Sequence, residues 1–181
     1  AACERDGVPI QRRCSAGGCV IQAPGCLNFA FVLSMDRPGC DTIHGSYKFI
    51  LGTITGGLNG MGIQAHRAGT SDLAIGDLKV SGNSQKRKRL HFLHHGTLLY
   101  GFDITPCAAY LSEPFDRPDY RGVRPHKDFL TNIDSSRDVL IKAVSPLFPQ
   151  ANAAAPSAEE LAEAKAVAKT KYARGDWVYR R

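Results

Sequence analysis

The sequence has no long hydrophobic run, no CxxC pair and no internal repeat. Its apolar stretches fall short of the roughly 20 residues that a membrane-spanning helix needs, so we expect no membrane association. Six cysteines are scattered without a regular framework, and the polar start, AACERD, does not resemble a signal peptide. These absences favour reduced thiols and a cytoplasmic location.

The composition is that of an ordinary globular domain. Hydrophobic residues make up 43% of the 181 residues and charged residues 22%, which is enough chain for one domain with a buried core. The 23 basic and 17 acidic residues give a net charge of +6, and this surplus favours an anionic partner: a nucleotide, a nucleic acid or an acidic protein. The first residue is Ala1 rather than methionine, so we expect that the natural protein has residues upstream of it.

Hydrophobic patterning predicts an α+β fold with a mixed, mostly antiparallel sheet and flanking helices. Short apolar runs predict strands at residues 8–11, 28–33, 62–67, 72–75, 78–81 and 92–102. Helical spacing and capping residues predict helices at residues 1–6, 41–60, 105–111, 135–148 and 157–173. Residues 116–125 are expected to form a loop, and residues 177–179 a final strand or tail. We expect a single domain over residues 1–181.

Lys79 is the first candidate for a functional residue. It follows a Gly76-Asp77 turn between two short apolar runs, which is the pattern of a hairpin. A lysine on a rigid strand can place its ammonium against a phosphate or a developing oxyanion. The small residues that follow it leave the backbone open to a ligand, and residues 82–85 are expected to form a polar turn. A solvated strand lysine is the alternative interpretation.

A second candidate segment is the loop from Arg12 to Val20. Its Gly17-Gly18 pair can expose backbone N–H groups to a phosphate or carboxylate, and Arg12 and Arg13 supply positive charge. An ordinary glycine-rich turn with solvated arginines is the alternative.

The third candidate segment contains His94-His95-Gly96 at the entry to an apolar strand. Two adjacent histidines could bind a metal, but no further ligands stand at suitable spacing, so strand histidines that form hydrogen bonds with the backbone are favoured. The preceding basic run, residues 86–89, could touch nucleic acid, although a solvated hairpin loop is the more frequent outcome for such a run.

Taken in order, these segments resemble the motifs of the lipoate–protein ligase A family, within the biotin/lipoate ligase and octanoyltransferase superfamily. The family's first motif has two arginines, Ser-Gly-Gly-Gly, a histidine and then Gly-x-Leu-Asn; residues 12–28 of this chain read RRCSAGGCVIQAPGCLN. The second motif, Asn-Asp-Leu and then Lys-x-Ser-Gly, corresponds to residues 71–73 (SDL) and 79–85 (KVSGNSQ). The third, HHGTLL, is intact at residues 94–99, and the family's closing aromatic segment has a weaker match at residues 171–179.

The resemblance implies a class II biotin/lipoate ligase-like catalytic domain that handles a lipoyl or octanoyl chain. ATP, Mg²⁺ and lipoic or octanoic acid are the implied cofactors and substrates, and the product is an acyl-adenylate that a lysine of an acceptor domain attacks. Lys79 is the implied catalytic residue, and Asp72 would orient the nucleotide or bind Mg²⁺. The implied substrate-binding residues are Arg12, Arg13, Ser15, Gly17, Gly18, Cys19, Gln22, Asn28, Asp72, Ser81, Gly82, Asn83, His95, Gly96 and Thr97.

The implied partner is a small acidic lipoyl-acceptor domain of a 2-oxoacid dehydrogenase or a glycine cleavage H-type protein, which agrees with the positive net charge. Ligases of this family that make their own adenylate carry an additional C-terminal domain. We expect this chain to lack that domain and the N-terminal portion of the catalytic domain, and to need a separate accessory subunit. Nucleic acid is not expected as a partner.

Departures from the family motifs leave two alternatives open. The chain has Ala16 in place of the first glycine of the triplet, Cys19 in place of a small residue, Gln22 in place of a histidine and Ser71 in place of an asparagine. One alternative is a cysteine-dependent octanoyl or lipoyl transferase with Cys107 as the acyl-carrying nucleophile. The other is a non-catalytic homologue that binds a nucleotide, an acyl group or a nucleic acid.

Overall fold

The computed structural model describes residues 2–114, 117–145 and 154–180, which form two compact units. The first unit comprises residues 16–149, and the second comprises residues 1–15 and 150–181. None of the helices in the described part of the chain is long and apolar enough to cross a membrane.

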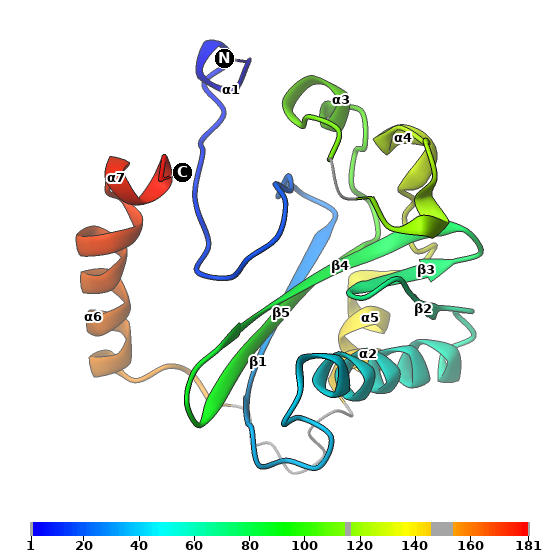
Figure 1. Ribbon diagram of the computed structural model, residues 1–181, viewed down its shortest axis with the longest axis horizontal. Helices are drawn as coiled ribbons and strands as arrows, with labels where there is room; N and C mark the ends of the chain where they lie inside the picture. The colour runs from blue at the N-terminus through cyan, green and yellow to red at the C-terminus, as the bar shows by residue number, and fades with distance from the viewer. Residues whose placement is uncertain (1, 115–116, 146–153, 181) are drawn as a thin grey trace. The chain divides into compact units, whose positions relative to one another are not determined.

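A five-stranded sheet forms the frame of the first unit (Figure 1). Its strands are β1 (Cys26–Ser34), β2 (His66–Ala68), β3 (Asp72–Ile75), β4 (Leu78–Arg87) and β5 (His91–Leu99). They lie in the order β1-β5-β4-β3-β2, and all four neighbouring pairs are antiparallel. The predicted α+β class with a mostly antiparallel sheet is therefore confirmed.

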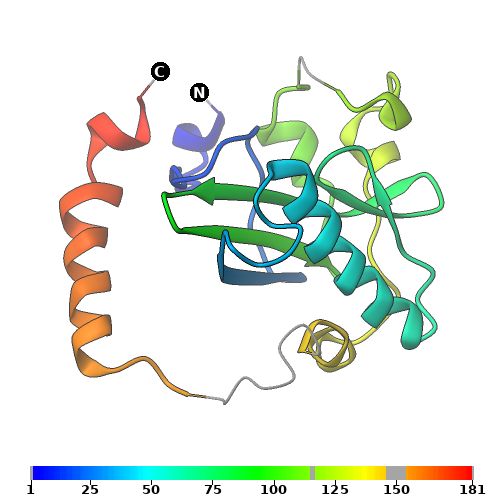
Figure 2. The same ribbon diagram turned by 60° about the horizontal axis from the view of Figure 1, so that its bottom comes forward.

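One face of the sheet packs against helix α2 (Ile43–Gly60), which lies across the strands in Figure 2. Thr42 caps this helix, since its hydroxyl accepts a hydrogen bond of 3.0 Å from the N–H of Gly45. The apolar face of α2 and helix α5 (Arg137–Val144) bury the same core as the strands. The largest fully buried residues of this core include Ile50, Leu51, Ile54, Leu58, Leu73, Phe92, Leu98 and Leu140.

Short helical segments connect the end of β5 to α5. They are α3 (Pro106–Tyr110), the 3₁₀ turn η1 (Asp119–Arg121) and α4 (His126–Phe129). Residues 130–131 then run beside β4, where the N–H of Thr131 donates a 2.9 Å hydrogen bond to the carbonyl of Lys79. The strand that carries Lys79 is thus held on both of its edges.

The second unit consists of α1 (Ala2–Arg5), α6 (Ala158–Val167), the π-helical turn η3 (Ala168–Tyr172) and α7 (Gly175–Val178). The predicted capping box is present: the Ser157 hydroxyl accepts from the N–H of Glu160, whose carboxylate accepts from the N–H of Ser157.

Several predicted elements differ from the structure. Residues 8–11 form no strand, because Pro9 has no N–H to donate to a ladder and no partner strand lies beside them among the described residues. Residues 82–85 lie inside β4 rather than in a turn, because β5 pairs with them throughout. Of the strand predicted at 62–67, only residues 66 and 67 are extended, within β2. Of the final strand or tail predicted at 177–179, residues 177 and 178 lie in helix α7. The end of the helix predicted at 135–148 lies outside the described residues.

Candidate functional site

The sheet register brings residues of all three motifs into one row. Asp72 of β3 pairs with Gly82 of β4, Gly82 pairs with Thr97 of β5, and Thr97 pairs with Asn28 of β1. Residues that are directly paired across strands point to the same face of a sheet. This face is the one opposite α2, since its alternate neighbours Phe92 and Leu98 on β5 belong to the core.

A β-bulge places Lys79 on the same face as this row. Asp72 and Leu73 pair with Gly82 and Ser81, whereas Ala74 pairs with Lys79, so Val80 is an extra residue in β4. In a regular strand, positions 79 and 82 would point to opposite faces, and one extra residue reverses that relation. A Cβ atom built on Gly82 would lie 3.2 Å from both Cε and Nζ of Lys79. The ammonium therefore lies over Gly82, and the absence of a side chain there leaves it room.

Asp72 and Tyr120 fix the position of the Lys79 ammonium. Nζ of Lys79 is 2.8 Å from Oδ1 of Asp72, and the hydroxyl of Tyr120 donates a 2.9 Å hydrogen bond to Oδ2. Asp72 is buried, and the Lys79 side chain keeps 25% of its surface exposed. Burial, and then the negative charge of Asp72, raise the pKa of Tyr120, so its phenol stays protonated and remains a donor. The result is a lysine with a fixed direction and an accessible end.

Tyr120 itself is held by the segment that follows it. Its ring packs against the ring of Phe129 at a centroid distance of 5.1 Å, and the guanidinium of Arg121 stacks on the Phe129 ring at 4.7 Å. Arg121 is buried and pairs with Glu113. These contacts make η1 a rigid support even though it lies in a stretch rich in proline and charge.

The glycine-rich loop is attached to the face that carries Lys79. The hydroxyl of Ser84 donates a 2.7 Å hydrogen bond to the carbonyl of Ala16, and Ser84 points to the same face as Gly82, two positions before it on β4. Gly17 has a φ of 103°, which favours glycine, whereas a Cβ atom built on Gly18 would meet no heavy atom within 4 Å. Ala16, directly before the glycine pair, is thus anchored on the face that carries Lys79. A slot between the glycine pair and the ammonium stays a prediction.

Of the other predicted residues, Gln22 joins the row by a hydrogen bond and His95 lies on the same face. The Gln22 amide donates to the hydroxyl of Thr97 at 3.2 Å, and that hydroxyl donates to Oδ1 of Asn28 at 2.8 Å. His95 pairs with Ser84 and lies on the same face. Gln22 stands where the family has a histidine, and its amide fills a polar role at that position.

Three predicted residues lie on the other face, towards α2. Ser81 and Gly96 are buried there, and the side chain of Asn83 occupies the space over Gly96. A Cβ atom on Gly96 would lie 2.0 Å from Oδ1 of Asn83, so only glycine fits. The Asn83 amide donates to the carbonyl of Ser71 at 2.9 Å and to the hydroxyl of Ser81 at 3.1 Å. From the face towards α2, these residues support the end of the strand that carries Asp72.

A buried histidine completes this support. Nδ1 of His94 is 3.1 Å from the amide nitrogen of Gln85, and Nε2 is 3.3 Å from Oδ1 of Asn83. Because Gln85 presents its NH₂ group and Asn83 its oxygen, His94 accepts at Nδ1 and donates at Nε2, which defines a neutral tautomer. Burial, and next the neighbouring His95, lower the pKa of His94 to about 4. His94 is therefore satisfied by side chains, whereas the sequence analysis expected satisfied histidines with backbone partners.

The predicted arginines belong to the second unit. Arg12 donates from Nε to the carbonyl of Val178 at 3.1 Å and from Nη2 to the carbonyl of Arg180. Arg13 donates to the hydroxyl of Ser15 at 3.0 Å. Arg12 thus fastens the C-terminal segment, and a role for Arg12, Arg13 and Ser15 in substrate binding stays a prediction, as does one for the exposed Cys19.

Cys107 has the environment of a structural thiol. It is buried in α3, and this burial raises its pKa, with smaller contributions from Cys26 and Asp103. A cysteine nucleophile needs a lowered pKa and access to its substrate. All six cysteines of the chain are free thiols.

Asp72 does not fit a magnesium site held by protein ligands. Both of its oxygens already have partners, one of which is the Lys79 ammonium. No group of three or more acidic, histidine or cysteine side chains in the described ranges is arranged to hold a metal.

Comparison with known proteins then assigns the family. The model of the lipoyl protein ligase A/B catalytic domain matches residues 1–151. The chain belongs to this family. Lipoate-protein ligase LplJ of Bacillus subtilis is 30% identical over 135 residues, which cover 75% of this chain and 40% of that protein. Lipoate-protein ligase A of Blochmanniella floridana is 33% identical over 135 residues, covering 72% and 38%. The chain thus spans about two fifths of the length of these relatives.

Solved structures show the same fold. A bipartite lipoate protein ligase of Thermoplasma acidophilum, studied with its E2 lipoyl domain, superposes with a TM-score of 0.81 at 21% identity, over 98% of this chain and 72% of that one. A lipoate-protein ligase A bound with ATP gives a TM-score of 0.78 at 22% identity, over 97% and 73%. A putative lipoate protein ligase of T. acidophilum with bound lipoic acid gives 0.80 at 20% identity, over 97% and 73%.

Sequence reasoning missed two residues of the site. Tyr120 lies 48 positions from the aspartate that it contacts, and no local pattern marks it. Ser84 was assigned to a turn, although the alternation of small and polar residues in β4 is a signal that places it two positions after Gly82 on the same face.

Proposed function

We propose that this protein is the catalytic part of a lipoate–protein ligase, which transfers a lipoyl group to a lysine of an acceptor domain. One observation carries the proposal: the bulge in β4 directs the Lys79 ammonium to the face where Asp72, Gly82, Thr97 and Asn28 form a row. Family membership supports lipoyl chemistry, and the glycine-rich loop attached to the same face supports a site for an activated carboxylate.

The proposed reaction has two steps. A carboxylate oxygen of lipoate attacks the α-phosphorus of ATP, and the bond to pyrophosphate breaks to give lipoyl-AMP. The amine of the acceptor lysine then attacks the acyl carbon, the bond to AMP breaks, and the amine loses a proton as the amide forms. ATP is a substrate here, and the attacking nucleophile belongs to the acceptor, so the chain needs no nucleophile of its own.

Lys79 acts in both steps by its charge. Its ammonium neutralises the phosphate of the adenylate and stabilises the oxyanion that develops at the acyl carbon. Asp72 and Tyr120 keep this ammonium in one place, so little reorganisation accompanies the reaction. The space beside Gly18, where a side chain would meet no heavy atom within 4 Å, lets the substrate come close, and the amide and hydroxyl groups of Gln22 and Thr97 supply polar contacts for it. No step is assigned to Mg²⁺, because the donor set at Asp72 does not fit it.

The structures of relatives support the proposed substrates and partner. Structures of the fold have been solved with ATP and with lipoic acid, and one was studied with an E2 lipoyl domain. We therefore propose ATP and lipoate as substrates and a lipoyl domain of a 2-oxoacid dehydrogenase or an H-type protein as acceptor. Octanoate is the alternative acid, and the free cysteines support a cytoplasmic location.

Replacement of Lys79 tests the proposal. Lipoyl transfer from synthetic lipoyl-adenylate to an unmodified acceptor domain is measured by mass spectrometry for the parent chain and for Lys79→Gln. We expect a loss of at least about 100-fold in rate, the size seen when a preorganised oxyanion partner is removed. Lys86→Gln, an exposed lysine on the same strand, is the control and keeps its rate. Equal rates for both variants would falsify the assignment of Lys79.

A second assay separates adenylate formation from its use. The parent chain is incubated with ATP, Mg²⁺ and lipoate, and the release of pyrophosphate is followed. Transfer from supplied adenylate without pyrophosphate release means that a separate accessory subunit is needed. Activity in neither assay favours the non-catalytic alternative.

A further inference from the structure

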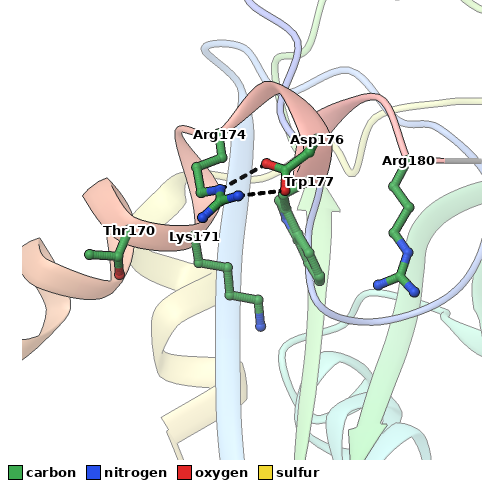
Figure 3. A pocket seen from close by; sticks show the side chains of 6 residues that line it. All are labelled: Thr170, Lys171, Arg174, Asp176, Trp177 and Arg180. Atoms are coloured by element: carbon green, nitrogen blue, oxygen red, sulfur yellow. Dashed lines mark hydrogen bonds and ion pairs between the residues drawn. The ribbon is translucent and has the colours of Figure 1, made fainter.

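The second unit contains a basic cavity that the proposed reaction does not use. It has a volume of about 400 Å³ and lies within the C-terminal segment. It is lined by Thr170, Lys171, Arg174, Asp176, Trp177 and Arg180 (Figure 3). Some of these residues belong to the aromatic segment at residues 171–179 that resembles the family's closing motif. The proposed reaction assigns this segment no role.

Two cations of this cavity are available to an anion. Arg174 donates from Nε and Nη2 to the two oxygens of Asp176 at 2.8 Å each, so this pair satisfies itself. Lys171 and Arg180 form no ion pair with any carboxylate of residues 2–114, 117–145 and 154–180. In Figure 3 the indole of Trp177 lies between them, and both side chains extend away from the backbone on either side of the ring.

The backbone of the segment is built to hold this arrangement. Residues 168–172 form a π-helical turn, with a 2.8 Å hydrogen bond from the N–H of Ala173 to the carbonyl of Ala168. Such turns are rare and occur frequently at functional sites. The turn sets the Lys171 ammonium 4.3 Å from the centre of the Trp177 ring.

Contacts with Arg12 fix the other side of the cavity. The indole N–H of Trp177 donates to the carbonyl of Arg12 at 2.9 Å, and the guanidinium of Arg12 binds the carbonyls of Val178 and Arg180. The polar edge of Trp177 is thus satisfied, and its orientation is fixed relative to the Lys171 and Arg180 positions.

Charge is segregated along this part of the chain. The acidic residues Glu159, Glu160 and Glu163 lie in the first part of α6. After Glu163 the described residues include the cations Lys165, Lys169, Lys171, Arg174 and Arg180, with Asp176 as the acidic side chain. The cavity therefore lies at the basic end of the segment, which attracts an anionic partner over a distance of several ångströms.

We propose that this Trp177-centred cavity is a docking site for an acidic protein surface, from which a carboxylate side chain enters beside Trp177, where Lys171 and Arg180 line the cavity. The lining favours a protein over a small molecule. Small-molecule sites are mostly apolar and enclosed, whereas here five of the six lining residues are polar or charged and the cations are at the surface. Tryptophan and arginine are enriched among the residues that contribute most to binding at protein interfaces. The partner's identity rests on the proposed function, under which it is the acidic acceptor domain.

Trp177 also provides the measurement, because it is the chain's single tryptophan. The full chain is titrated with an unmodified lipoyl domain that contains no tryptophan, without ATP or lipoate, and the fluorescence of Trp177 is followed. We expect a saturable change that weakens as salt is added. Lys171→Gln with Arg180→Gln should raise the dissociation constant about tenfold, because each removed cation contributes about threefold at low salt.

The control has the same change in charge outside the cavity. Lys165→Gln with Lys169→Gln alters two exposed cations of the same helical segment that do not line the cavity. This variant should bind within about twofold of the parent, and equal weakening by both variants would show a diffuse charge effect and overturn the proposal. A response to inorganic phosphate alone, at similar concentrations, would overturn it in favour of a small-anion site.

The assay does not depend on catalysis. Lys79→Gln should bind the lipoyl domain as the parent does, even if it transfers nothing. Suppose that the parent chain binds the lipoyl domain, that Lys171→Gln with Arg180→Gln weakens this binding, and that the parent chain transfers no lipoyl group. This result would support the docking site and reject the proposed function. The opposite result is also possible: the Lys171→Gln with Arg180→Gln variant transfers the lipoyl group with the parent's KM for the acceptor, and titration with the lipoyl domain does not change the fluorescence of Trp177. This result would reject the docking site but not the proposed function.

Discussion

At the scale of single residues, the site depends on how one ammonium is held. Lys79 is bound by Asp72, Asp72 is bound by Tyr120, and Gly82 leaves the space that the ammonium occupies. Each of these residues can be replaced by a chemically similar amino acid, so the contribution of each residue to activity can be measured separately.

Replacement of Tyr120 by phenylalanine should weaken the hold on Asp72 without removing the ion pair. The Asp72 carboxylate loses one donor, and the ammonium gains freedom of movement. We expect the transfer rate to fall about fivefold and the free energy of unfolding to fall by about 1 kcal/mol, the usual value of one hydrogen bond. Single-turnover transfer and urea unfolding measure the two effects. Tyr179→Phe, at an exposed tyrosine, should change neither, and a matching loss there would contradict the role of Tyr120.

Gly82→Ala should affect activity more than stability. Its new methyl group would lie 3.2 Å from Nζ of Lys79, so the ammonium must shift by a few tenths of an ångström. Glycine inside a strand otherwise weakens it, so the alanine variant should fold at least as well as the parent. We expect the transfer rate to fall about tenfold, because a displaced charge stabilises the oxyanion less well. An alanine variant with the parent's rate in the same single-turnover assay would mean that Lys79 acts from another position.

At the scale of elements, the bulge in β4 and the crossing of α2 with α5 decide how the site is supported. The bulge moves Lys79 to the row of Asp72, Gly82, Thr97 and Asn28. The helices hold the sheet from behind, and they approach most closely at Gly57, where a Cβ atom would lie 1.9 Å from the carbonyl oxygen of Ala143.

This close approach predicts opposite effects for neighbouring glycines. Gly57→Ala forces α2 and α5 apart and should lower the free energy of unfolding by about 3 kcal/mol, as overpacking against backbone does. Gly56→Ala meets no heavy atom within 4 Å, and it should raise that free energy by about 0.5–1 kcal/mol through helix propensity. Thermal and denaturant unfolding of the two variants check the prediction. Similar effects of both would contradict the packing of these helices.

Hydrophobic patterning predicted most elements correctly. It was wrong where the presence or absence of a pairing strand decides whether a segment forms a strand. Strand β3 and the start of β4 have the predicted bounds because a Gly76 turn with a φ of 53° separates them. Residues 82–85 look like a turn in isolation, since they are small and polar. They form a strand because β5 satisfies their backbone groups on one side. Residues 8–11 have strand-forming side chains but no partner among the described residues.

At the scale of the whole molecule, the buried His94 couples folding to pH. Its hydrogen bonds require the neutral ring, and its pKa of about 4 in the folded state lies below the ordinary value of 6.5. The unfolded chain therefore binds more protons between these two values, so the fold loses stability as the pH falls from about 6.5 towards 4.

The expected loss from His94 is on the order of 3 kcal/mol over this range, at about 1.4 kcal/mol for each pH unit of the shift. Urea unfolding at a series of pH values measures it. His94→Gln removes the titrating group and should flatten the curve in this window. His44→Gln, which changes an exposed histidine, should leave the curve as steep as in the parent. A parent curve that is flat between pH 6.5 and 4 would contradict the buried neutral state.

The residues of the candidate site also fall into those that local sequence could predict and those that it could not. The motifs identified Lys79, Asp72, Gly82, Thr97 and the glycine-rich loop, because each is marked by residue type and spacing. Neither Tyr120 nor the support by Asn83 and His94 could be recognised. Tyr120 lies 48 positions from Asp72, and the contacts of Asn83 and His94 depend on how the strands pair. Side-chain direction is likewise not local: a single extra residue in β4 decides to which face Lys79 points.

The order and chemistry of the three motifs, the alternation within the strands and the amphipathic α2 are properties of the sequence alone, and they were sufficient to indicate the family and the fold class. Tertiary structure alone decided that residues 28, 72, 82 and 97 form one row, that Lys79 joins it and that Trp177 lies between two cations. The reason is physical: residue type fixes what a side chain can do, whereas strand register and packing between distant segments fix what it meets.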